Sequence, residues 1–241
     1  MYEKARYLIS GDRGLVVEFG DEISQEVNKK VRNLYLTLQK NTIKGIDEII
    51  PTYRSVLIQY NPLEIGIDKL MAQLEDMEKS LGSIAVQKPR IIEIPTAYGG
   101  EFGEDIGFVA EHNNLSIADV IKLHSTTDYL VYMLGFTPGF PYLGGMSEKI
   151  ETPRLKTPRT KIPAGSVGIA GKQTGIYPIE SPGGWQLIGR TPVKLYDPER
   201  EVPIILQSGD YIRFVPIAAE EYNEICALID EKRYEVKIIT E

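Results

Sequence analysis

The spacing of apolar residues predicts a small α+β domain in the first third of the chain. Arg6–Ser10 and Gly14–Phe19 read as two strands joined by a turn, and Ser55–Tyr60 reads as a third strand. Apolar side chains elsewhere recur every three or four positions, which indicates two amphipathic helices. The first repeat is Ile23, Val27, Val31, Leu34 and Leu38, and the second is Ile67, Leu70, Leu74, Met77 and Leu81. This ββαβα order predicts an antiparallel sheet covered on one face by both helices, within residues 1–82.

The chain beyond residue 90 predicts many short strands with a few helices. Expected strands are Arg90–Pro95, Asp128–Leu134, Val193–Tyr196, Ile204–Leu206, Tyr211–Val215 and Tyr234–Ile239, and expected helices are Glu104–Glu111, Ile117–His124 and Ala219–Glu231. Short strands separated by glycine and proline turns are typical of a β-barrel or a sandwich, here with peripheral helices. We therefore expect a mostly-β domain at 90–241, with Gly82–Pro89 as the domain boundary.

A segment within this second domain, residues 135–192, is too rich in glycine and proline for a long helix. It contains 8 of the 15 prolines and 11 of the 22 glycines, so it must consist of short strands and shaped loops. Aromatic and cationic side chains are interleaved with them: Phe136, Phe140, Tyr142, Tyr177 and Trp185 with Arg154, Lys156, Arg159, Lys161, Lys172 and Arg190. Rigid loops that present aromatic rings and guanidinium groups together are typical of a binding site.

The charge distribution suggests a small anionic ligand. The chain has a net charge of −7, which argues against nucleic-acid binding because an acidic surface repels phosphate backbones. From Lys149 to Lys194, however, eight lysines and arginines stand against two acidic residues. A basic region in an acidic chain indicates a nucleotide, a phosphate or a carboxylate as ligand. The alternative is a set of solvated loop charges.

The few cysteine and histidine residues limit other kinds of chemistry. A single cysteine, Cys226, excludes an internal disulfide, and with only His112 and His124 beside it no metal site is expected. Cys226 falls on the apolar side of a predicted helix, where we expect a buried structural thiol. A cytoplasmic location fits this composition. The longest apolar run, Tyr129–Leu134, is far shorter than the roughly 20 residues that span a bilayer, so no membrane insertion is expected.

Five polar side chains are candidates for ligand binding or proton transfer. His124 ends a predicted helix, so it is either a cation that stabilises the helix dipole or a catalytic group. Glu101 lies in a glycine loop, either as an accessible catalytic carboxylate or as an ordinary exposed acid. The guanidinium groups of Arg154, Arg159 and Arg190 can each bind an oxyanion through two hydrogen bonds.

Two further features concern possible ligand contacts. Trp185 is either a core residue or a platform for a planar ligand. The stretch GSVGIAGKQ at 165–173 is similar to a phosphate-binding P-loop, but five residues separate its glycines instead of four. Gln173 also stands where the Mg²⁺-binding serine or threonine is required. We therefore exclude a Walker site.

Six ordered motifs together give the chain a resemblance to a known family. They are YGGEFG at 98–103, LHS at 123–125, GFTPGFPYLG at 135–144, PAGSVGIAG at 163–171, QTGIYP at 173–178 and SPGGW at 181–185. The set resembles the B subunit of 5-oxoprolinase, from a bacterial family also known as allophanate hydrolase subunit 1, which includes the sporulation-kinase inhibitor KipI. The resemblance covers nearly the whole chain. It implies a small N-terminal α/β domain followed by a cyclophilin-like β-barrel.

The resemblance also implies an activity and partners. It implies an ATP-dependent hydrolase that opens the lactam 5-oxo-L-proline to L-glutamate together with subunits A and C, with ATP as co-substrate, with or without Mg²⁺. Phosphorylation of the amide oxygen makes the unreactive lactam an electrophile, and arginines and N–H groups stabilise the negative charge that develops. The implied catalytic residues are Glu101, His124 and Arg159, and the implied substrate- or nucleotide-binding residues are Phe136, Phe140, Arg154, Gln173, Trp185 and Arg190.

Two other functions stay open. Proline-rich loops with exposed aromatic residues also suit a protein interface, so the alternative is a protein-binding inhibitor of a sporulation histidine autokinase. A peptidyl-prolyl isomerase would follow from barrel shape alone, which does not establish an activity. Because a Walker loop is missing, the nucleotide is either bound unconventionally or held by the partner subunits.

Overall fold

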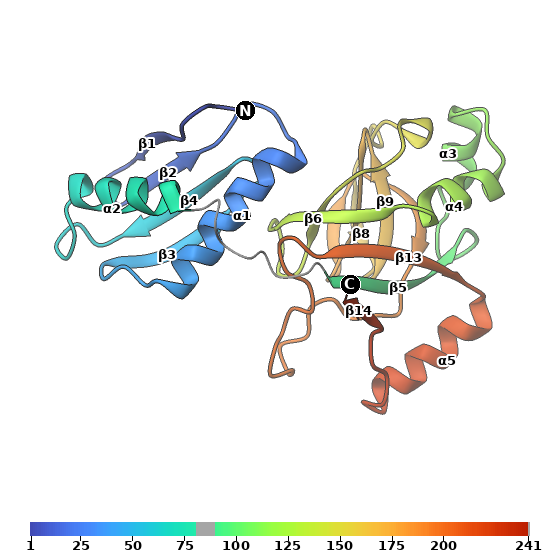
Figure 1. Ribbon diagram of the computed structural model, residues 1–241. Coiled ribbons are helices and arrows are strands. Elements are labelled where there is room, and N and C mark those ends of the chain that lie inside the picture. The colour runs from blue at the N-terminus through green and yellow to red at the C-terminus, as the bar shows by residue number, and fades with distance from the viewer. Residues whose placement is uncertain (81–89, 241) are drawn as a thin grey trace. The chain divides into compact units, whose positions relative to one another are not determined.

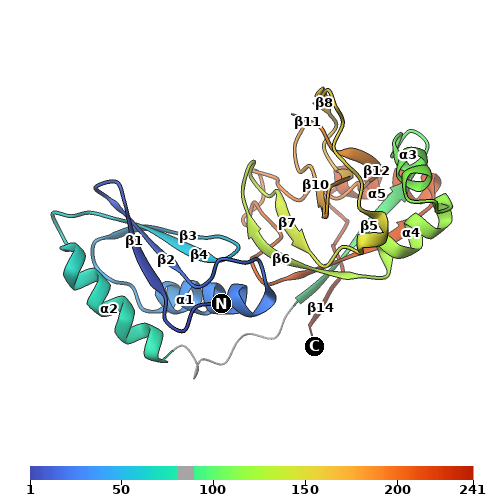
Figure 2. The same ribbon diagram turned by 90° about the horizontal axis from the view of Figure 1, so that it is seen from above.

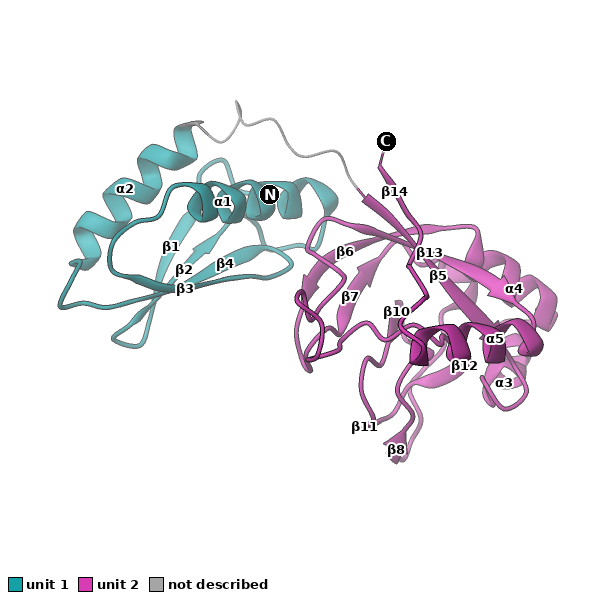
Figure 3. Cartoon of the chain, turned by 90° about the horizontal axis from the view of Figure 1, so that it is seen from below, with its two compact units in different colours: residues 1–87 teal, residues 88–241 magenta. Residues whose placement is uncertain are grey.

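The chain forms two compact units. A computed structural model describes residues 1–80 and 90–240, and the chain divides into Met1–Gln87 and Lys88–Glu241 (Figure 3). The boundary expected at Gly82–Pro89 lies outside the described residues. Each unit has its own hydrophobic core. No helix within 1–80 or 90–240 is both long enough and apolar enough to cross a bilayer.

The first unit is a four-stranded antiparallel sheet with two helices (Figure 1). Its elements are β1 (Arg6–Ser10), β2 (Gly14–Glu18), α1 (Gln25–Lys40), β3 (Ile46–Pro51), β4 (Ser55–Tyr60) and α2 (Ile67–Ser80). The strands pair in the order β1-β2-β4-β3. The predicted ββαβα order is wrong because it omits β3. This strand lies at the edge of the sheet and carries a bulge between Ile46 and Glu48, so the alternation that marks a strand is weak there.

Both helices of the first unit pack against the sheet through one shared core. The core combines Val27, Val31, Leu34, Leu38, Leu70 and Leu74 of the helices with Leu15, Val17, Val56 and Ile58 of the strands. Helix α1 begins after Ser24, whose hydroxyl accepts a hydrogen bond from the backbone N–H of Val27 at 3.2 Å. It ends before Asn41, whose backbone N–H donates to the carbonyl of Thr37.

The second unit is a nearly closed β-barrel with helices beside it. Its elements are β5 (Arg90–Tyr98), α3 (Ile106–His112), α4 (Ile117–Ser125), β6 (Asp128–Leu134), β7 (Pro141–Gly144), the 3₁₀ turn η2 (Glu148–Ile150), β8 (Arg159–Ile162), β9 (Ser166–Ala170), β10 (Gln173–Ile176), β11 (Ser181–Gly183), β12 (Gln186–Arg190), β13 (Tyr211–Ile217), α5 (Ala219–Asp230) and β14 (Ile238–Thr240). The barrel order is β10-β9-β12-β5-β13-β6-β7, and its end strands β7 and β10 contact each other. The expected mostly-β barrel is confirmed. Strands β8 and β11 form a separate two-stranded arm that extends from it (Figure 2).

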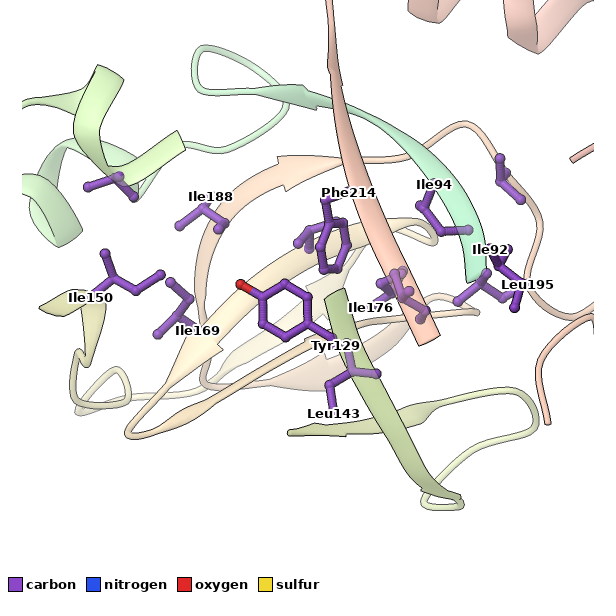
Figure 4. Close-up of a cluster of buried hydrophobic side chains, with 14 of the residues drawn as sticks. Ile92, Ile94, Tyr129, Leu143, Ile150, Ile169, Ile176, Ile188, Leu195 and Phe214 are labelled. Atoms are coloured by element: carbon purple, nitrogen blue, oxygen red, sulfur yellow. The ribbon is translucent and has the colours of Figure 1, made fainter. Parts of the chain in front are cut away.

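Apolar side chains fill the interior of the barrel (Figure 4). Ile94 of β5, Ile169 of β9 and Ile188 of β12 are fully buried there. The rings of Tyr129 and Phe214 meet edge to face with centroids 5.4 Å apart. Helix α3 packs against β12, α4 against β13 and α5 against β5. The barrel interior is therefore a packed core and not a ligand channel.

Several expectations for the C-terminal part of the chain are wrong. Val193–Tyr196 and Ile204–Leu206 are not strands, and one isolated β-bridge joins the two segments. The last strand is Ile238–Thr240 instead of Tyr234–Ile239. Apolar side chains of these segments pack on the barrel core without a continuous backbone ladder, so their burial produces a strand-like pattern.

The structure also tests two further interpretations of the sequence, one on Cys226 and one on the stretch 165–173. Cys226 is half-buried, so the expectation of a buried thiol is wrong, although burial still raises its pKa. The stretch 165–173 forms the β9–β10 hairpin, with Gly171 at φ +58° in its turn. A strand–turn–strand arrangement lacks the helix that follows a Walker loop.

Candidate functional site

The proline- and glycine-rich segment builds a cavity in the second unit. The cavity has a volume of about 460 Å³ and is lined by Phe136, Phe140, Tyr142, Arg154, Pro158, Gln173, Tyr177, Pro182, Gly183, Gly184 and Trp185. Five residues that the sequence nominates for ligand binding are thus brought together: Phe136, Phe140, Arg154, Gln173 and Trp185. Their contact with a ligand stays a prediction. Their convergence makes this cavity the candidate site.

One wall of the cavity is a cluster of aromatic rings around Phe140. The centroid of its ring lies 5.5 Å from that of Phe136, 5.4 Å from Tyr142, 5.7 Å from Tyr177 and 5.8 Å from Trp185, each edge to face. Edge-to-face contacts place the positive edge of one ring on the negative face of another, so they fix the orientation of the rings. Such a wall suits the face of a flat ligand and excludes water.

Two glycines let the chain approach these rings closely. A Cβ atom at Gly175 would lie 3.1 Å from Cζ3 of Trp185. A Cβ atom at Gly183 would clash with the hydroxyl of Tyr177. The aromatic rings occupy the space that side chains would otherwise take, which explains glycine in the QTGIYP and SPGGW motifs.

Phe136 stands at the cavity with a strained backbone. Its φ angle is +64°, in the left-handed region that bulky residues rarely adopt. It remains 66% exposed although its ring contacts Phe140. Strained residues cluster at functional sites, where the surrounding structure holds them in place. The strain here presents an aromatic ring to the solvent beside the cavity.

Arg154 is the charged side chain among the described residues that line the cavity. Its guanidinium carbon lies 6.0 Å from the centroid of the Trp185 ring, within the range of a cation–π contact. Burial raises the pKa of Tyr177 to about 12, partly offset by the nearby positive charge of Arg154. The phenol is therefore protonated at neutral pH. The cavity combines one positive charge with apolar walls and a neutral hydroxyl.

Arg159 is engaged with carboxylates instead of facing the cavity. Its Nη2 donates to Oδ1 and Oδ2 of Asp105 at 2.8 and 2.9 Å, and it lies 3.0 Å from Oε1 of Glu104. Its Nη1 donates to the carbonyl of Trp185 at 3.2 Å. The structure thus gives no support to direct anion binding by Arg159, because both terminal nitrogens of its guanidinium already have protein partners.

Arg190 and Glu101 lie together outside the cavity lining. Nη2 of Arg190 donates to the backbone carbonyl of Glu101 at 3.4 Å, and the guanidinium also interacts with Tyr222 of α5. The Glu101 side chain is exposed in a glycine turn. Of the three arginines that the sequence nominates, Arg154 alone lines the cavity.

His124 is fully buried in the barrel. Its Nδ1 lies 2.7 Å from the Tyr98 hydroxyl and its Nε2 lies 2.8 Å from Oγ1 of Thr174. Thr174 donates to the carbonyl of Gly168 at 3.0 Å, so it accepts from Nε2–H, and Nδ1 accepts from Tyr98. Burial lowers the pKa of His124 to about 3. Of the two readings of His124, the cationic helix cap is wrong because this imidazole is neutral at pH 7. Its ring does not line the cavity, and its catalytic role stays a prediction.

Sequence reasoning missed Asp105 entirely. The helix expected at Glu104–Glu111 places Asp105 in its first turn, where an acidic residue is ordinary, so nothing in the pattern distinguishes it. Tyr142 and Tyr177 stand among the interleaved aromatic residues of the sequence, but no motif gives either of them a particular role. In the part of the chain that the structure describes, no group of three or more His, Cys, Asp and Glu side chains could hold a metal ion.

Comparisons with known proteins give the chain clear relatives. The family model for the carboxyltransferase domain, subdomain C and D, matches residues 5–206. A Bacillus subtilis protein named as the B subunit of 5-oxoprolinase is 45% identical over 90% of this chain and 96% of its own length. The crystal structure of TTHA0988 has a TM-score of 0.77 and 38% identity, and it covers 86% of this chain. The present chain spans 40% of that longer chain. A conserved uncharacterized protein from Pyrococcus horikoshii is 48% identical over 90% of this chain and all of its own, with a TM-score of 0.54.

Proposed function

The chain belongs to the carboxyltransferase subdomain C and D family and to its 5-oxoprolinase B subunits, and on that premise we propose that it works as such a subunit. The proposed enzyme is a cytoplasmic, ATP-dependent cyclic amide hydrolase that opens 5-oxo-L-proline to L-glutamate. It is active in complex with partner subunits A and C. The observation that carries the proposal for this chain is the aromatic cavity with one arginine.

The chemistry of 5-oxo-L-proline fits this cavity. The molecule is a small five-membered lactam that bears a single carboxylate. In the proposal, Arg154 binds the carboxylate and Trp185 packs on the ring, and the side-chain amide of Gln173 complements the lactam N–H and C=O. The cluster around Phe140 keeps water away from the bound lactam. These residues bind and orient the substrate, and they exclude water from it.

The residues of the cavity do not fit a nucleoside triphosphate. A triphosphate is held by several cations, by Mg²⁺ and by a glycine-rich loop before a helix. The cavity lining supplies one guanidinium, and the stretch 165–173 is a β-hairpin. We therefore assign ATP to the partner subunits of the complex, and no phosphoryl-transfer step to the residues of this cavity.

The lengths of the relatives support the proposed partners. In TTHA0988 the matched segment is 40% of a longer chain, so that unit stands beside further protein in one polypeptide. The relative named as the B subunit of 5-oxoprolinase, 96% of which this chain covers, likewise carries a name that implies further subunits. The proposal also takes residues 1–82 and 90–241 as the two domains, with the barrel as a cyclophilin-like one.

One observation is also compatible with the alternative of a kinase inhibitor. Phe136 is 66% exposed in the GFTPGFP loop, and an exposed aromatic residue suits a protein interface. The same exposure equally suits a contact with another subunit of the enzyme. Binding of the lactam separates these functions, because only the enzyme subunit requires a lactam in the cavity.

The test is a titration of the chain with 5-oxo-L-proline, followed by the fluorescence of Trp185, the only tryptophan. The wild-type signal should saturate, and Arg154→Ala should weaken binding about tenfold, the equivalent of about 1.4 kcal/mol for one exposed charge-assisted contact. The control is Lys156→Ala, which removes an exposed positive charge two residues away that does not line the cavity. Equal affinity in the wild type and Arg154→Ala, or no saturable signal, would refute the proposed substrate site. Release of glutamate by the reconstituted complex then tests the activity.

A further inference from the structure

Asp105 lies where a residue would normally cap a helix, but its side chain makes no capping hydrogen bond. It precedes α3, and its carboxylate turns away from the first turn of that helix. Aspartate at this position usually accepts hydrogen bonds from the first free N–H groups of the helix. Here the carboxylate makes no such hydrogen bond, so its hydrogen-bond partners lie in other parts of the chain.

Those other parts are the two segments that flank the cavity. Oδ2 of Asp105 accepts from the backbone N–H of Leu187 at 2.6 Å, and the backbone N–H of Asp105 donates to the carbonyl of Leu187 at 2.9 Å. The carboxylate also takes both hydrogen bonds from Nη2 of Arg159, the first residue of β8. Asp105 therefore joins the start of α3 to β8 and to β12.

Arg159 links Asp105 to the backbone of Trp185. While Nη2 is fixed by Asp105, Nη1 of the same planar guanidinium donates to the carbonyl of Trp185. The backbone of Trp185 is thus held through Arg159, and that of Leu187, two residues later, is held by Asp105 directly. The side chains of Asp105 and Arg159 are 14% and 23% exposed, so this ion pair is largely protected from solvent screening.

The indole of Trp185 depends on that backbone position. Its ring lies edge to face with Phe140 and Tyr177, at 5.8 and 6.0 Å between centroids, and it passes close to Gly175. Because the indole is packed this closely, even a small shift of the Trp185 backbone would press the ring against its neighbours. Asp105 itself does not line the cavity.

We propose that Asp105 is a positioning residue of the cavity, which acts through Arg159 and Leu187 to fix the indole of Trp185 in the cavity wall. The inference rests on the proposed function only in taking this cavity as the ligand site. It gives Arg159 a role other than anion binding. A lysine could not replace it, since an ammonium group lacks the planar fork that reaches Asp105 and the Trp185 carbonyl together.

The experiment measures the fluorescence of the single tryptophan in the whole chain without ligand. Asp105→Asn removes the negative charge and places an NH2 donor where Oδ1 accepts from Nη2 of Arg159, so two donors face each other and the hold on the guanidinium is weakened. The emission of Trp185 should shift to longer wavelength, and acrylamide should quench it more strongly. Arg159→Lys should give the same change, and the double variant should show no larger effect than either single one.

The matched control is Asp128→Asn, which removes a bidentate pair with Arg213 elsewhere in the same unit. Its tryptophan emission should equal that of the wild type. Unchanged emission and quenching in folded Asp105→Asn and Arg159→Lys would overturn the proposal, as would an equal change in Asp128→Asn. Circular dichroism verifies folding, and if Asp105→Asn does not fold, Arg159→Lys decides. Because this readout needs no ligand, failure of 5-oxo-L-proline to bind would refute the proposed substrate and leave this result standing.

Discussion

The buried His124 makes the stability of the second unit depend on pH in a defined direction. Its imidazole is neutral and fully buried between Tyr98 and Thr174, and burial lowers its pKa from 6.5 to about 3. In the unfolded chain the same group has its ordinary pKa. As the pH falls below 6.5, the unfolded state therefore binds a proton that the folded state rejects, and the free energy of unfolding decreases until the pH reaches about 3.

The size of this effect follows from the two pKa values. Each unit of difference is worth about 1.4 kcal/mol, so the drop from 6.5 to about 3 corresponds to a total loss of about 5 kcal/mol. At pH 5 the loss from this group should be about 2 kcal/mol, because the pH is then about 1.5 units below the unfolded pKa. A loss of about 2 kcal/mol is a substantial share of the roughly 5–15 kcal/mol that typically stabilises a domain.

The assay is urea unfolding at pH 7 and pH 5, followed by Trp185 fluorescence, which reports on the same unit. His124→Gln retains an amide that can donate to Thr174 but removes the titrating group, so it should be less stable at pH 7 yet lose about 2 kcal/mol less between the two pH values. The control is His112→Gln, which removes the other histidine of the chain, an exposed one, and should keep the wild-type difference. The same loss in His124→Gln as in the wild type would refute this account of the buried imidazole.

Two further predictions concern the loops that shape the cavity. Gly183→Ala should lower the free energy of unfolding by about 1–3 kcal/mol through its clash with the Tyr177 hydroxyl, whereas Gly184→Ala, which meets nothing closer than 3.6 Å, should have little effect; urea unfolding of the two variants checks this. Phe136→Gly should be more stable than Phe136→Ala by about 1 kcal/mol, the reverse of the usual order, because φ at this residue is +64°. Thermal unfolding of both variants measures that difference, and a more stable alanine variant would contradict the assigned strain.

The sequence predicts the fold best where a pattern is local and repeats. The α1 helix and strands β1, β4 and β6 appear where the apolar spacing places them. Strand β3 is missed because it lies at a sheet edge with a bulge, so its backbone pairing leaves little trace in the side-chain pattern. The strands predicted around Val193 and Ile204 are wrong for the opposite reason. Side chains are buried there, but the backbone does not pair as a continuous strand.

The sequence likewise predicts the local features of the candidate site better than its long-range contacts. The density of glycine, proline and aromatic residues at 135–192 identifies the loops of the cavity, because those residue types determine loop shape directly. The partners of the charged groups are set by contacts distant in the sequence, which no local pattern contains. Arg159 meets Asp105, which lies 54 residues away, and His124 meets Thr174, which lies 50 residues away. Residue types therefore indicate the cavity, while the role of each charge requires the fold.

The same long-range pairing decides what charge a ligand meets in the cavity. Residues 149–194 have a net charge of +6 by sequence, which alone would favour a polyanion. In the structure, Lys172 lies 2.8 Å from Glu148, Lys161 lies 3.0 Å from Glu180, and Arg159 is neutralised by Asp105. The two exposed lysine pairs are screened by solvent and contribute little at a distance, and the Arg159 charge is offset by its carboxylate partner. The field inside the apolar walls is then dominated by Arg154, and a single positive charge favours a ligand with one carboxylate over one with several phosphates.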